Sequence, residues 1–168
     1  EDYDKLSVLG EEQARRLGEY WVRHGMAFDR VYTGPLSRQR RSAEIVRDVY
    51  AAAGAEFPPV EEVESLAEMP VERLAQRFMP QLCSEDEQAL RAMQRYMATD
   101  DKREKEKLFQ KAFEKLMLKW AEETYNDPEI ETFRCFVERV TKGIGSMTVG
   151  DVNGQRVAAF TSGGPTAV

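Results

Sequence analysis

Residues 31–46 read VYTGPLSRQRRSAEIV, and the order of residue types in this segment predicts a strand, a turn and a helix. The apolar run stops at Gly34-Pro35, and a helical pattern follows at once. Arg38, Arg40 and Arg41 fall in the first turns of that helix, where the helix dipole disfavours cations. Backbone N–H groups at a helix start bind anions. The arginines therefore indicate either a phosphate site or an exposed cationic surface, and charge alone does not choose between them.

The preceding segment predicts a helix from about Val8 to Arg23, with Ser7 as its N-cap and Gly25 as its left-handed end. Four residues recur at helical spacing and are expected to form its buried stripe: Ala14, Leu17, Gly18 and Trp21. Residues 28–33 then read as a short strand.

The helix after Gly34-Pro35 is expected to end at Gly54. Its predicted apolar face consists of Ala43, Val46, Val49, Tyr50 and Ala53. Pro58-Pro59 reads as a linker to a further short strand at about 60–66. This alternation of helices and strands predicts an α/β fold with a parallel or mixed sheet.

From Met69 to about Val140 the pattern is helical, which predicts an insertion over about 69–142. Ser84 and Glu87 predict a capping box. The three expected apolar faces contain Leu90, Met93 and Met97; Leu108, Ala112, Phe113, Leu116, Met117 and Trp120; and Phe133, Phe136, Val137 and Val140. The second of these helices is expected over 102–125 and the third over 132–142. The block could be a lid, a partner surface or additional core.

Asn153-Gly154 predicts a hairpin-type turn, and residues 156–160 predict a strand apolar enough to be central. This strand, like the one before Gly34-Pro35, ends in threonine, glycine and proline and leads into a helix. In open α/β sheets such strand ends meet and form the ligand crevice.

The composition sets limits on function. The chain has 168 residues, enough for one domain with a real core, and its net charge of −6 argues against a nucleic-acid or anionic-membrane surface. His24 is the only histidine, which argues against a zinc or di-iron site. Cys83 and Cys135 read as reduced thiols of a cytoplasmic protein. The sequence has no apolar run of about eighteen residues that could span a membrane.

Two segments resemble the histidine phosphatase superfamily, branch 1, the phosphoglycerate mutase-like group. The matching residues of the first segment are Leu6-Ser7, Gly10, Gln13, Ala14, Gly34-Pro35-Leu36, Arg38, Ala43 and Glu44. The second segment is RVAAFTSGGP near the end of the sequence. The resemblance is strong over 3–50, good over 156–165 and weak through the helical block.

The resemblance implies a three-layer α/β/α sandwich with a central, mostly parallel sheet, and hydrolysis of phosphomonoesters through a phosphohistidine. By position, Arg38 matches the family's second phosphate-binding arginine and Glu68 its acid/base carboxylate. Ser162 stands where the family has a second histidine, and Gly163 follows it in the phosphate pocket. Without the family, a solvated glutamate remains an equal interpretation of Glu68. The resemblance implies a small phosphorylated substrate and neither a metal nor an organic cofactor; homo-oligomerisation stays open.

The sequence departs from the family at two points. The Arg-His-Gly strand that carries the nucleophile is expected before Glu1, and a C-terminal part is also expected outside the sequence. In addition, Ser162 cannot carry imidazolium charge, which predicts reduced turnover and disfavours mutase activity. Arg41 could substitute for the missing charge, although a surface role suits it better. The alternative function is a phosphate-binding or scaffold protein with a degenerate site.

Arg23-His24-Gly25 spells the family's tripeptide but closes a helix instead of a strand. A helix C-terminus favours the imidazolium form over the neutral nucleophile. We therefore interpret His24 as a helix-end residue.

Overall fold

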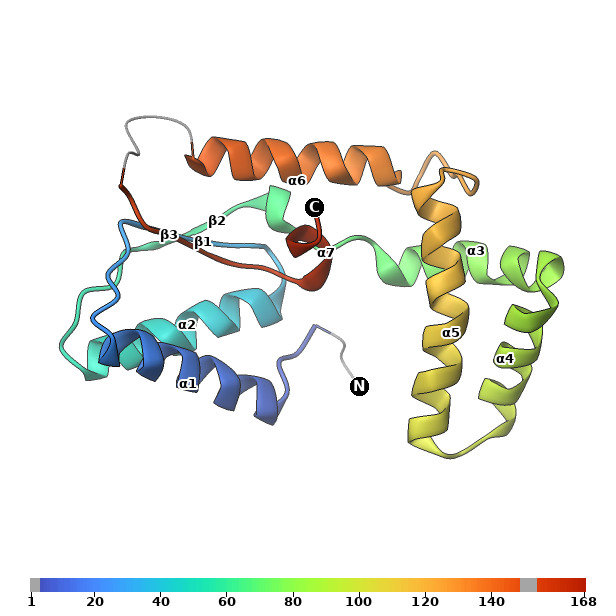
Figure 1. The fold of residues 1–168 in the computed structure, drawn as a ribbon, viewed down its shortest axis with the longest axis horizontal. Coiled ribbons are helices and arrows are strands. Elements are labelled where there is room, and N and C mark those ends of the chain that lie inside the picture. The colour runs from blue at the N-terminus through green and yellow to red at the C-terminus, as the bar shows by residue number, and fades with distance from the viewer. Residues whose placement is uncertain (1–3, 149–153) are drawn as a thin grey trace. The chain divides into compact units, whose positions relative to one another are not determined.

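The computed structural model describes residues 4–148 and 154–168. The chain divides into two compact units, which are described separately (Figure 1). The first contains the residues up to Glu68 and from Glu138 onward, and the second contains Met69–Val137. None of the helices in the described ranges is long and apolar enough to cross a membrane.

A parallel three-stranded sheet forms the centre of the first unit, with β2 (Val60–Glu62), β1 (Arg30–Thr33) and β3 (Val157–Phe160) in that order. In the pairing register, Val31 lies opposite both Val60 and Ala158. The predicted strand over 156–160 is present as β3; among the described strands, β1 lies in the middle and β3 pairs with one side of it. Burial alternates along β3, where Ala158 and Phe160 are buried and Ala159 is exposed.

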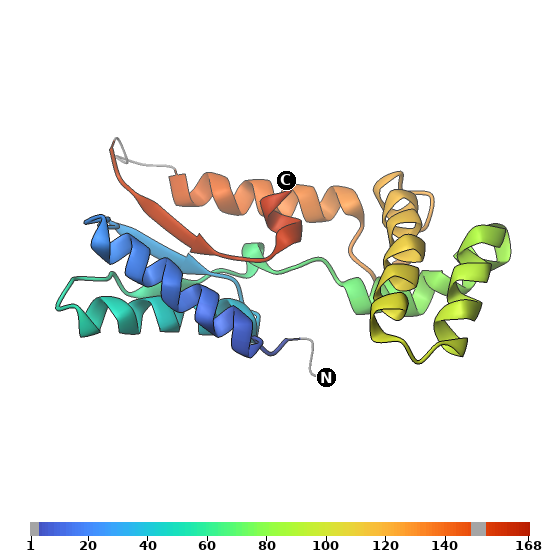
Figure 2. The ribbon, with the colours of Figure 1, turned by 60° about the horizontal axis from the view of Figure 1, so that its bottom comes forward.

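Helices cover both faces of this sheet, in the three-layer α/β/α arrangement that was expected (Figure 1 and Figure 2). On one face, Val31 packs with Val46 and Tyr50 of α2 (Ser37–Ala52). On the other face, Tyr32 packs with Leu66 and with Met147 of α6 (Phe133–Thr148). Successive residues of a strand point to opposite faces, so β1 contributes to both apolar layers.

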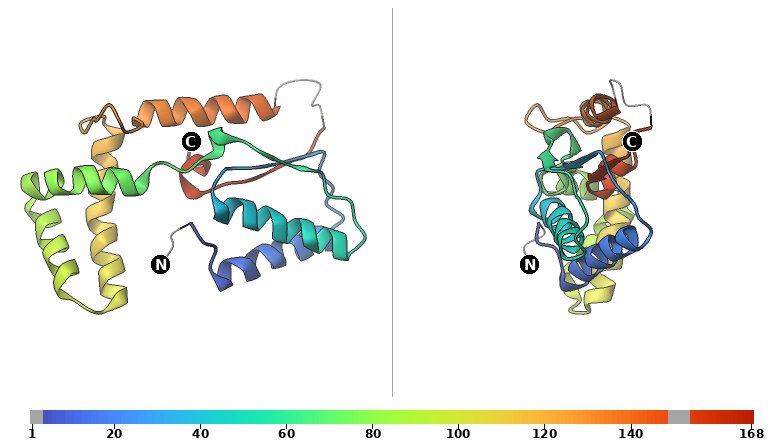
Figure 3. Two further views of the ribbon diagram at one scale, coloured as in Figure 1. Left: turned by 180° about the vertical axis from the view of Figure 1, so that it is seen from behind. Right: turned by 90° about the vertical axis from the view of Figure 1, so that its left-hand side faces the viewer.

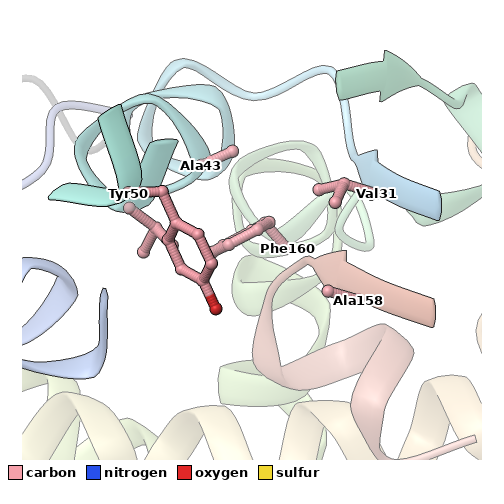
Figure 4. Packing of buried hydrophobic residues seen from close by; sticks show 6 residues of the cluster. Val31, Ala43, Tyr50, Ala158 and Phe160 are labelled. Atoms are coloured by element: carbon pink, nitrogen blue, oxygen red, sulfur yellow. The ribbon is translucent and has the colours of Figure 1, made fainter. Parts of the chain in front are cut away.

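Figure 4 shows the first of these layers, where the Tyr50 ring lies beside Phe160 and Val31 projects from β1 into the same space. The Tyr50 hydroxyl donates a hydrogen bond of 2.6 Å to the Met26 carbonyl oxygen, and burial raises the pKa of this phenol. The buried aromatic ring thus keeps its polar end satisfied, as a core tyrosine requires.

Helix α1 (Val8–Arg23) begins and ends as predicted. The Ser7 hydroxyl oxygen accepts a hydrogen bond from the Gly10 N–H, and Gly25 has a φ of +61°. Ala14 and Gly18 are buried, whereas Leu17 is 39% exposed and does not belong to the buried stripe. Gly18 is small enough to let α1 approach Val49 of α2. On α2 the predicted face is correct except at Ala53, which is exposed beyond the helix end, while Ile45 is an unpredicted buried member.

The second unit is helical, as expected, with α3 (Val71–Glu85), α4 (Glu87–Ala98), α5 (Lys102–Ala121) and the first turn of α6. Figure 3 shows α4 and α5 side by side. Ala112, Leu116 and Trp120 of α5 are buried, as their spacing predicted. Helix α5 ends at Ala121, before the expected Tyr125, and α6 extends to Thr148, beyond the expected Lys142.

The start of α4 differs from the prediction. Asp86 is its N-cap, and one carboxylate oxygen accepts hydrogen bonds of 2.9 Å from both the Gln88 and the Ala89 N–H. Ser84 lies inside α3 and donates to the Gln81 carbonyl oxygen, so the Ser84–Glu87 capping box is wrong. The buried positions of α4 are Ala89 and Ala92, whereas Leu90 and Met97 are exposed. Asn153 of the predicted Asn153-Gly154 turn lies outside the described residues.

Substitution of the observed cap tests this correction. A hydrogen bond from Lys115 and those from the Ala89 and Gln88 N–H groups lower the pKa of the Asp86 carboxyl below 3.8. A lowered carboxyl pKa contributes stability that is present above the ordinary pKa and is lost as the pH falls through the lowered one. At neutral pH, Asp86→Ala is expected to lower the melting temperature by several degrees and Ser84→Ala far less.

Thermal unfolding followed by circular dichroism over a pH series measures this difference. The difference in melting temperature between the wild-type protein and Asp86→Ala is expected to decrease towards acid pH. Equal losses in the two variants would contradict the assignment of Asp86 as the cap.

Candidate active site

The carboxyl ends of β1 and β3 meet in the first unit. The Gly34 N–H donates a hydrogen bond of 3.0 Å to the Phe160 carbonyl oxygen, so the two loops leave the sheet side by side. Beside them lies a cavity of about 490 Å³. The predicted site residues Arg38, Glu68, Ser162 and Gly163 all line this cavity. The structure therefore brings together residues that lie more than a hundred positions apart in the sequence.

Arg38 lies in the first turn of α2 and directs its guanidinium group to the end of β3. Its Nη2 donates to the Ser162 hydroxyl oxygen at 3.2 Å, and its side chain is 18% exposed. A partly desolvated guanidinium interacts more strongly with an anion than a fully hydrated one does. Arg38 is thus placed to bind an oxyanion at the strand ends.

Gln39 is a site residue that sequence reasoning missed. Its amide Nε2 donates to the Ser162 hydroxyl oxygen at 2.8 Å and to the Leu66 carbonyl oxygen at 3.2 Å, and its Oε1 accepts from the Leu36 N–H at 3.1 Å. The side chain is only 2% exposed. The signal was present in the sequence, because Gln39 precedes Ala43 and Val46 at helical spacing and so occupies the buried face of α2.

Gly34 is required by this arrangement. A Cβ atom at this position would collide with the Gln39 side chain and would approach the Leu66 carbonyl oxygen to 2.7 Å. The Gly34-Pro35 turn therefore reflects close packing around the Gln39 amide, in addition to its role in ending β1.

Ser162 accepts hydrogen bonds from both Arg38 and Gln39. A hydroxyl oxygen that accepts from two N–H donors keeps its own hydrogen for a third partner. The arrangement therefore orients the Ser162 O–H as a donor, which suits a phosphoryl oxygen. It does not supply the positive charge that an imidazolium would bring to this position.

Glu68 connects the end of β2 with the end of β3. Its Oε2 accepts a hydrogen bond of 3.2 Å from the Gly164 N–H. Nearby, the Thr161 hydroxyl donates to the Leu66 carbonyl oxygen at 2.9 Å. The half-buried carboxyl group of Glu68 is thus held at the cavity wall beside the loop that carries Ser162.

Asp4 is a second residue that sequence reasoning missed. Its carboxylate accepts from the Ser37 N–H at 2.8 Å and from the Arg38 N–H at 3.4 Å, and Arg38 Nη1 lies 3.4 Å from Oδ1. Desolvation opposes ionisation of Asp4, but these hydrogen bonds outweigh it and lower the pKa of the carboxyl. Leu36 has no side-chain acceptor, so Asp4 caps α2 in its place.

The other two arginines lie on the surface. Arg40 pairs with Glu62, and Arg41 pairs with Glu11 and Glu44, all as exposed ion pairs. Such pairs are solvated and contribute little stability. This placement agrees with the surface interpretation of Arg40 and Arg41 and gives no support to a catalytic role for Arg41.

His24 caps the C-terminus of α1, where its Nδ1 lies 2.8 Å from the Tyr20 carbonyl oxygen and its ring packs on Tyr20. Gly10, near the other end of the same helix, lines the cavity. Leu17 of the same helix also lines the cavity, so His24 lies about two helical turns beyond the nearest lining residue of α1. Among residues 4–148 and 154–168, no group of three or more His, Cys, Asp or Glu side chains could hold a metal ion.

Replacement of the buried amide tests the site architecture. Gln39→Leu preserves volume but removes the donors to Ser162 and Leu66 and leaves the Leu36 N–H without its acceptor. We expect a loss of about 1–3 kcal/mol in the free energy of unfolding, measured in urea. The exposed Gln94 of α4 provides the control, since Gln94→Leu is expected to change stability by less than about 0.5 kcal/mol. Equal effects would contradict the role assigned to Gln39.

Comparison with known proteins identifies the family. A family model described as the histidine phosphatase superfamily (branch 1) matches residues 2–116. Among solved structures, a candidate alpha-ribazole-5'-P phosphatase from Escherichia coli str. K-12 substr. MG1655 is similar, with a TM-score of 0.57 and 19% sequence identity. The similarity covers 96% of this chain but only 63% of that one, and at this identity it shows the fold alone. No curated protein matches the chain. The match to the family model covers well over half of the sequence, and the chain belongs to branch 1 of the histidine phosphatase superfamily.

Proposed function

We propose that the protein hydrolyses phosphomonoesters through a phosphohistidine intermediate. The observation that carries this proposal is the convergence of Arg38, Ser162 and Glu68 on one cavity at the carboxyl ends of parallel strands. Ligands of open α/β sheets bind at such strand ends. Membership of the histidine phosphatase superfamily supports this class of substrate.

The phosphoryl group would lie between Arg38 and Ser162. The guanidinium fork matches two phosphoryl oxygens, and the Ser162 hydroxyl donates to a further one. Gly163 is exposed at the cavity and would offer its backbone N–H. These groups stabilise the charge that spreads over the equatorial oxygens during transfer.

Glu68 would act as the general acid and base. As the histidine nitrogen forms its bond to phosphorus, the bond to the ester oxygen breaks and Glu68 gives its proton to the leaving alkoxide. In the second step Glu68 takes a proton from water, the water oxygen bonds to phosphorus and the histidine is released. Its position beside the loop of Ser162 supports this role.

The nucleophile is proposed to lie upstream of residue 1, on a strand that pairs with β3. Among the described strands, β3 has one unpaired edge, and Ala159 and Phe160 of this strand line the cavity. A parallel strand at that edge would end beside Ser162. This location would bring a histidine at its carboxyl end within reach of the phosphoryl group.

Hydrolysis by the full-length protein tests the proposal. Arg38→Gln is expected to lower kcat/KM for a phosphomonoester by about a hundredfold or more, because a fixed donor to the developing charge is lost. It should also abolish the thermal protection given by inorganic phosphate.

Two variants serve as controls. Arg41→Gln removes an exposed arginine on the same helix and should change neither kcat/KM nor the thermal protection by phosphate. His24→Ala should keep both hydrolysis and the acid-labile phosphoenzyme detected with labelled substrate. Loss of the phosphoenzyme in His24→Ala, or full activity in Arg38→Gln, would overturn the proposed site.

A second candidate function is phosphate binding without efficient turnover. Two features favour it. By the family resemblance, Ser162 stands where a second histidine is expected. In the structure, the Asp4 carboxylate accepts from the backbone N–H groups at the start of α2 and contacts Arg38. Both features reduce the positive charge that can stabilise the phosphoryl oxygens in the transition state. A phosphate-binding scaffold would retain the binding function of Arg38 and would show no phosphoenzyme.

Ser162→His separates the two candidates. In a phosphatase, the imidazole restores a charged donor at the phosphoryl oxygens and should raise kcat by at least about tenfold. Steady-state hydrolysis of the same ester measures this change, with Ser84→His, at an exposed position that does not line the cavity, as the control. An unchanged rate would show that Ser162 is not the source of a deficit. No hydrolysis in either protein, with phosphate binding retained, would favour the scaffold.

A further inference from the structure

The residues immediately before Glu68 form η1 (Glu64–Leu66), a single turn of 3-10 helix. The Glu64 carbonyl oxygen accepts the hydrogen bond that closes this turn, from the Ala67 N–H, but a helix this short leaves the carbonyl oxygens after Glu64 without partners inside the helix, so other groups must satisfy them. Arg139 of α6 does so, since its Nη1 donates to the carbonyl oxygens of Glu64 at 3.3 Å, Ser65 at 3.0 Å and Ala67 at 3.1 Å.

The remaining carbonyl of this run points to the active site. The Leu66 oxygen accepts from Gln39 Nε2 and from the Thr161 hydroxyl. All four consecutive carbonyls therefore have side-chain donors, three on the side of Arg139 and one on the side of the cavity. The turn is fixed from two directions, and Glu68 is the next residue along the chain.

Close packing reinforces this attachment. Gly143 lies one turn after Arg139 on α6 and is buried, and a Cβ atom there would collide with the Ser65 side chain. The Ser65 hydroxyl is buried and has no hydrogen-bond partner among the described residues. Steric fit, and not a polar contact of this hydroxyl, thus sets how closely the turn approaches α6.

We propose that Arg139 is a positioning residue for the acid/base function of Glu68, an inference that rests on the proposed phosphatase function. Glu68 is the last residue of the first unit before the chain enters the helical unit, and Glu138 is the first residue after its return. Arg139 therefore joins the segment that leaves the first unit to the segment that returns to it. The attachment lies directly before Glu68, the residue proposed to transfer the proton. Without this attachment, the Glu68 carboxyl would lose its fixed distance from the ester oxygen of the substrate whose phosphoryl group Arg38 and Ser162 hold.

The chemistry provides a selective readout. An alkoxide is a strong base and must be protonated as it leaves, whereas a nitrophenolate leaves readily without a proton. Displacement of the general acid therefore slows the cleavage of alkyl phosphates far more than that of nitrophenyl phosphate. A general loss of stability would slow both reactions alike.

The test compares kcat/KM for glycerol phosphate and p-nitrophenyl phosphate in the full-length protein. Arg139→Met is expected to lower the value for glycerol phosphate by about ten- to a hundredfold and that for nitrophenyl phosphate by less than about threefold. Inhibition by inorganic phosphate should not change, since Arg38 and Ser162 remain. Arg139→Lys keeps a side chain with several N–H donors and should retain most of the activity on glycerol phosphate. Lys142→Met removes an exposed cation from the same helix and is the matched control.

Glu68→Gln separates the failure of this inference from that of the proposed function. If Glu68→Gln shows no selective loss on glycerol phosphate, the role proposed for Glu68 fails, and with it the role of Arg139. If Glu68→Gln shows the loss and Arg139→Met does not, only the positioning role is overturned. The double variant should be no slower than Glu68→Gln on glycerol phosphate, and additive losses would also overturn the positioning role.

A second pair of variants gives the same test without touching Arg139. Gly143→Ala should displace the turn and produce the same selective loss on glycerol phosphate, and Ser65→Gly in the same chain should restore activity by making room for the added methyl group. An equal loss on both substrates, or no restoration by Ser65→Gly, would overturn the positioning role.

Discussion

The buried amide of Gln39 is the interaction on which the site depends. It joins the loop after β1, the turn after β2 and the loop after β3 by three hydrogen bonds from one side chain. The donors and the acceptor of a buried amide must all have hydrogen-bond partners, so only one arrangement of these three loops is compatible with Gln39. The position of Ser162 relative to Arg38 follows from this requirement, and so does the need for glycine at position 34.

A second constraint acts from the opposite face of the sheet. Helix α6 contributes Met147 to the apolar layer over Tyr32 and Arg139 to the carbonyls before Glu68. The loops of the site are therefore held from both layers of helices, with η1 between them. A site that includes an acid and an anion-binding group needs both attachments, because the two functions are supplied by different strands.

Much of the first unit could be predicted from the sequence, because local signals agree with the tertiary structure there. Ser7, Gly25 and the spacing of α2 predicted the helices correctly, and the resemblance placed Arg38, Glu68 and Ser162 at one cavity. The failures have physical causes. Asp86 is the cap in place of Ser84 because its carboxylate accepts from two backbone N–H groups at once. Leu17 follows the helical period but lies at the wall of the cavity, where it is 39% exposed. Asp4 was missed because it caps a helix that begins far along the chain.

The Asp4 carboxylate has one more consequence. A phosphate that binds at Arg38 does not meet an uncompensated cation, because an anion of the chain already lies there. Under the proposed function, binding at this position would be an exchange of one anion for another at the guanidinium group, and its free energy would be a difference between two similar interactions. Carboxylates and other monoanions match Asp4 closely and gain little from the exchange. A phosphomonoester dianion carries more charge and more acceptor oxygens, so under the proposed function this exchange would favour monoesters over diesters and carboxylic acids.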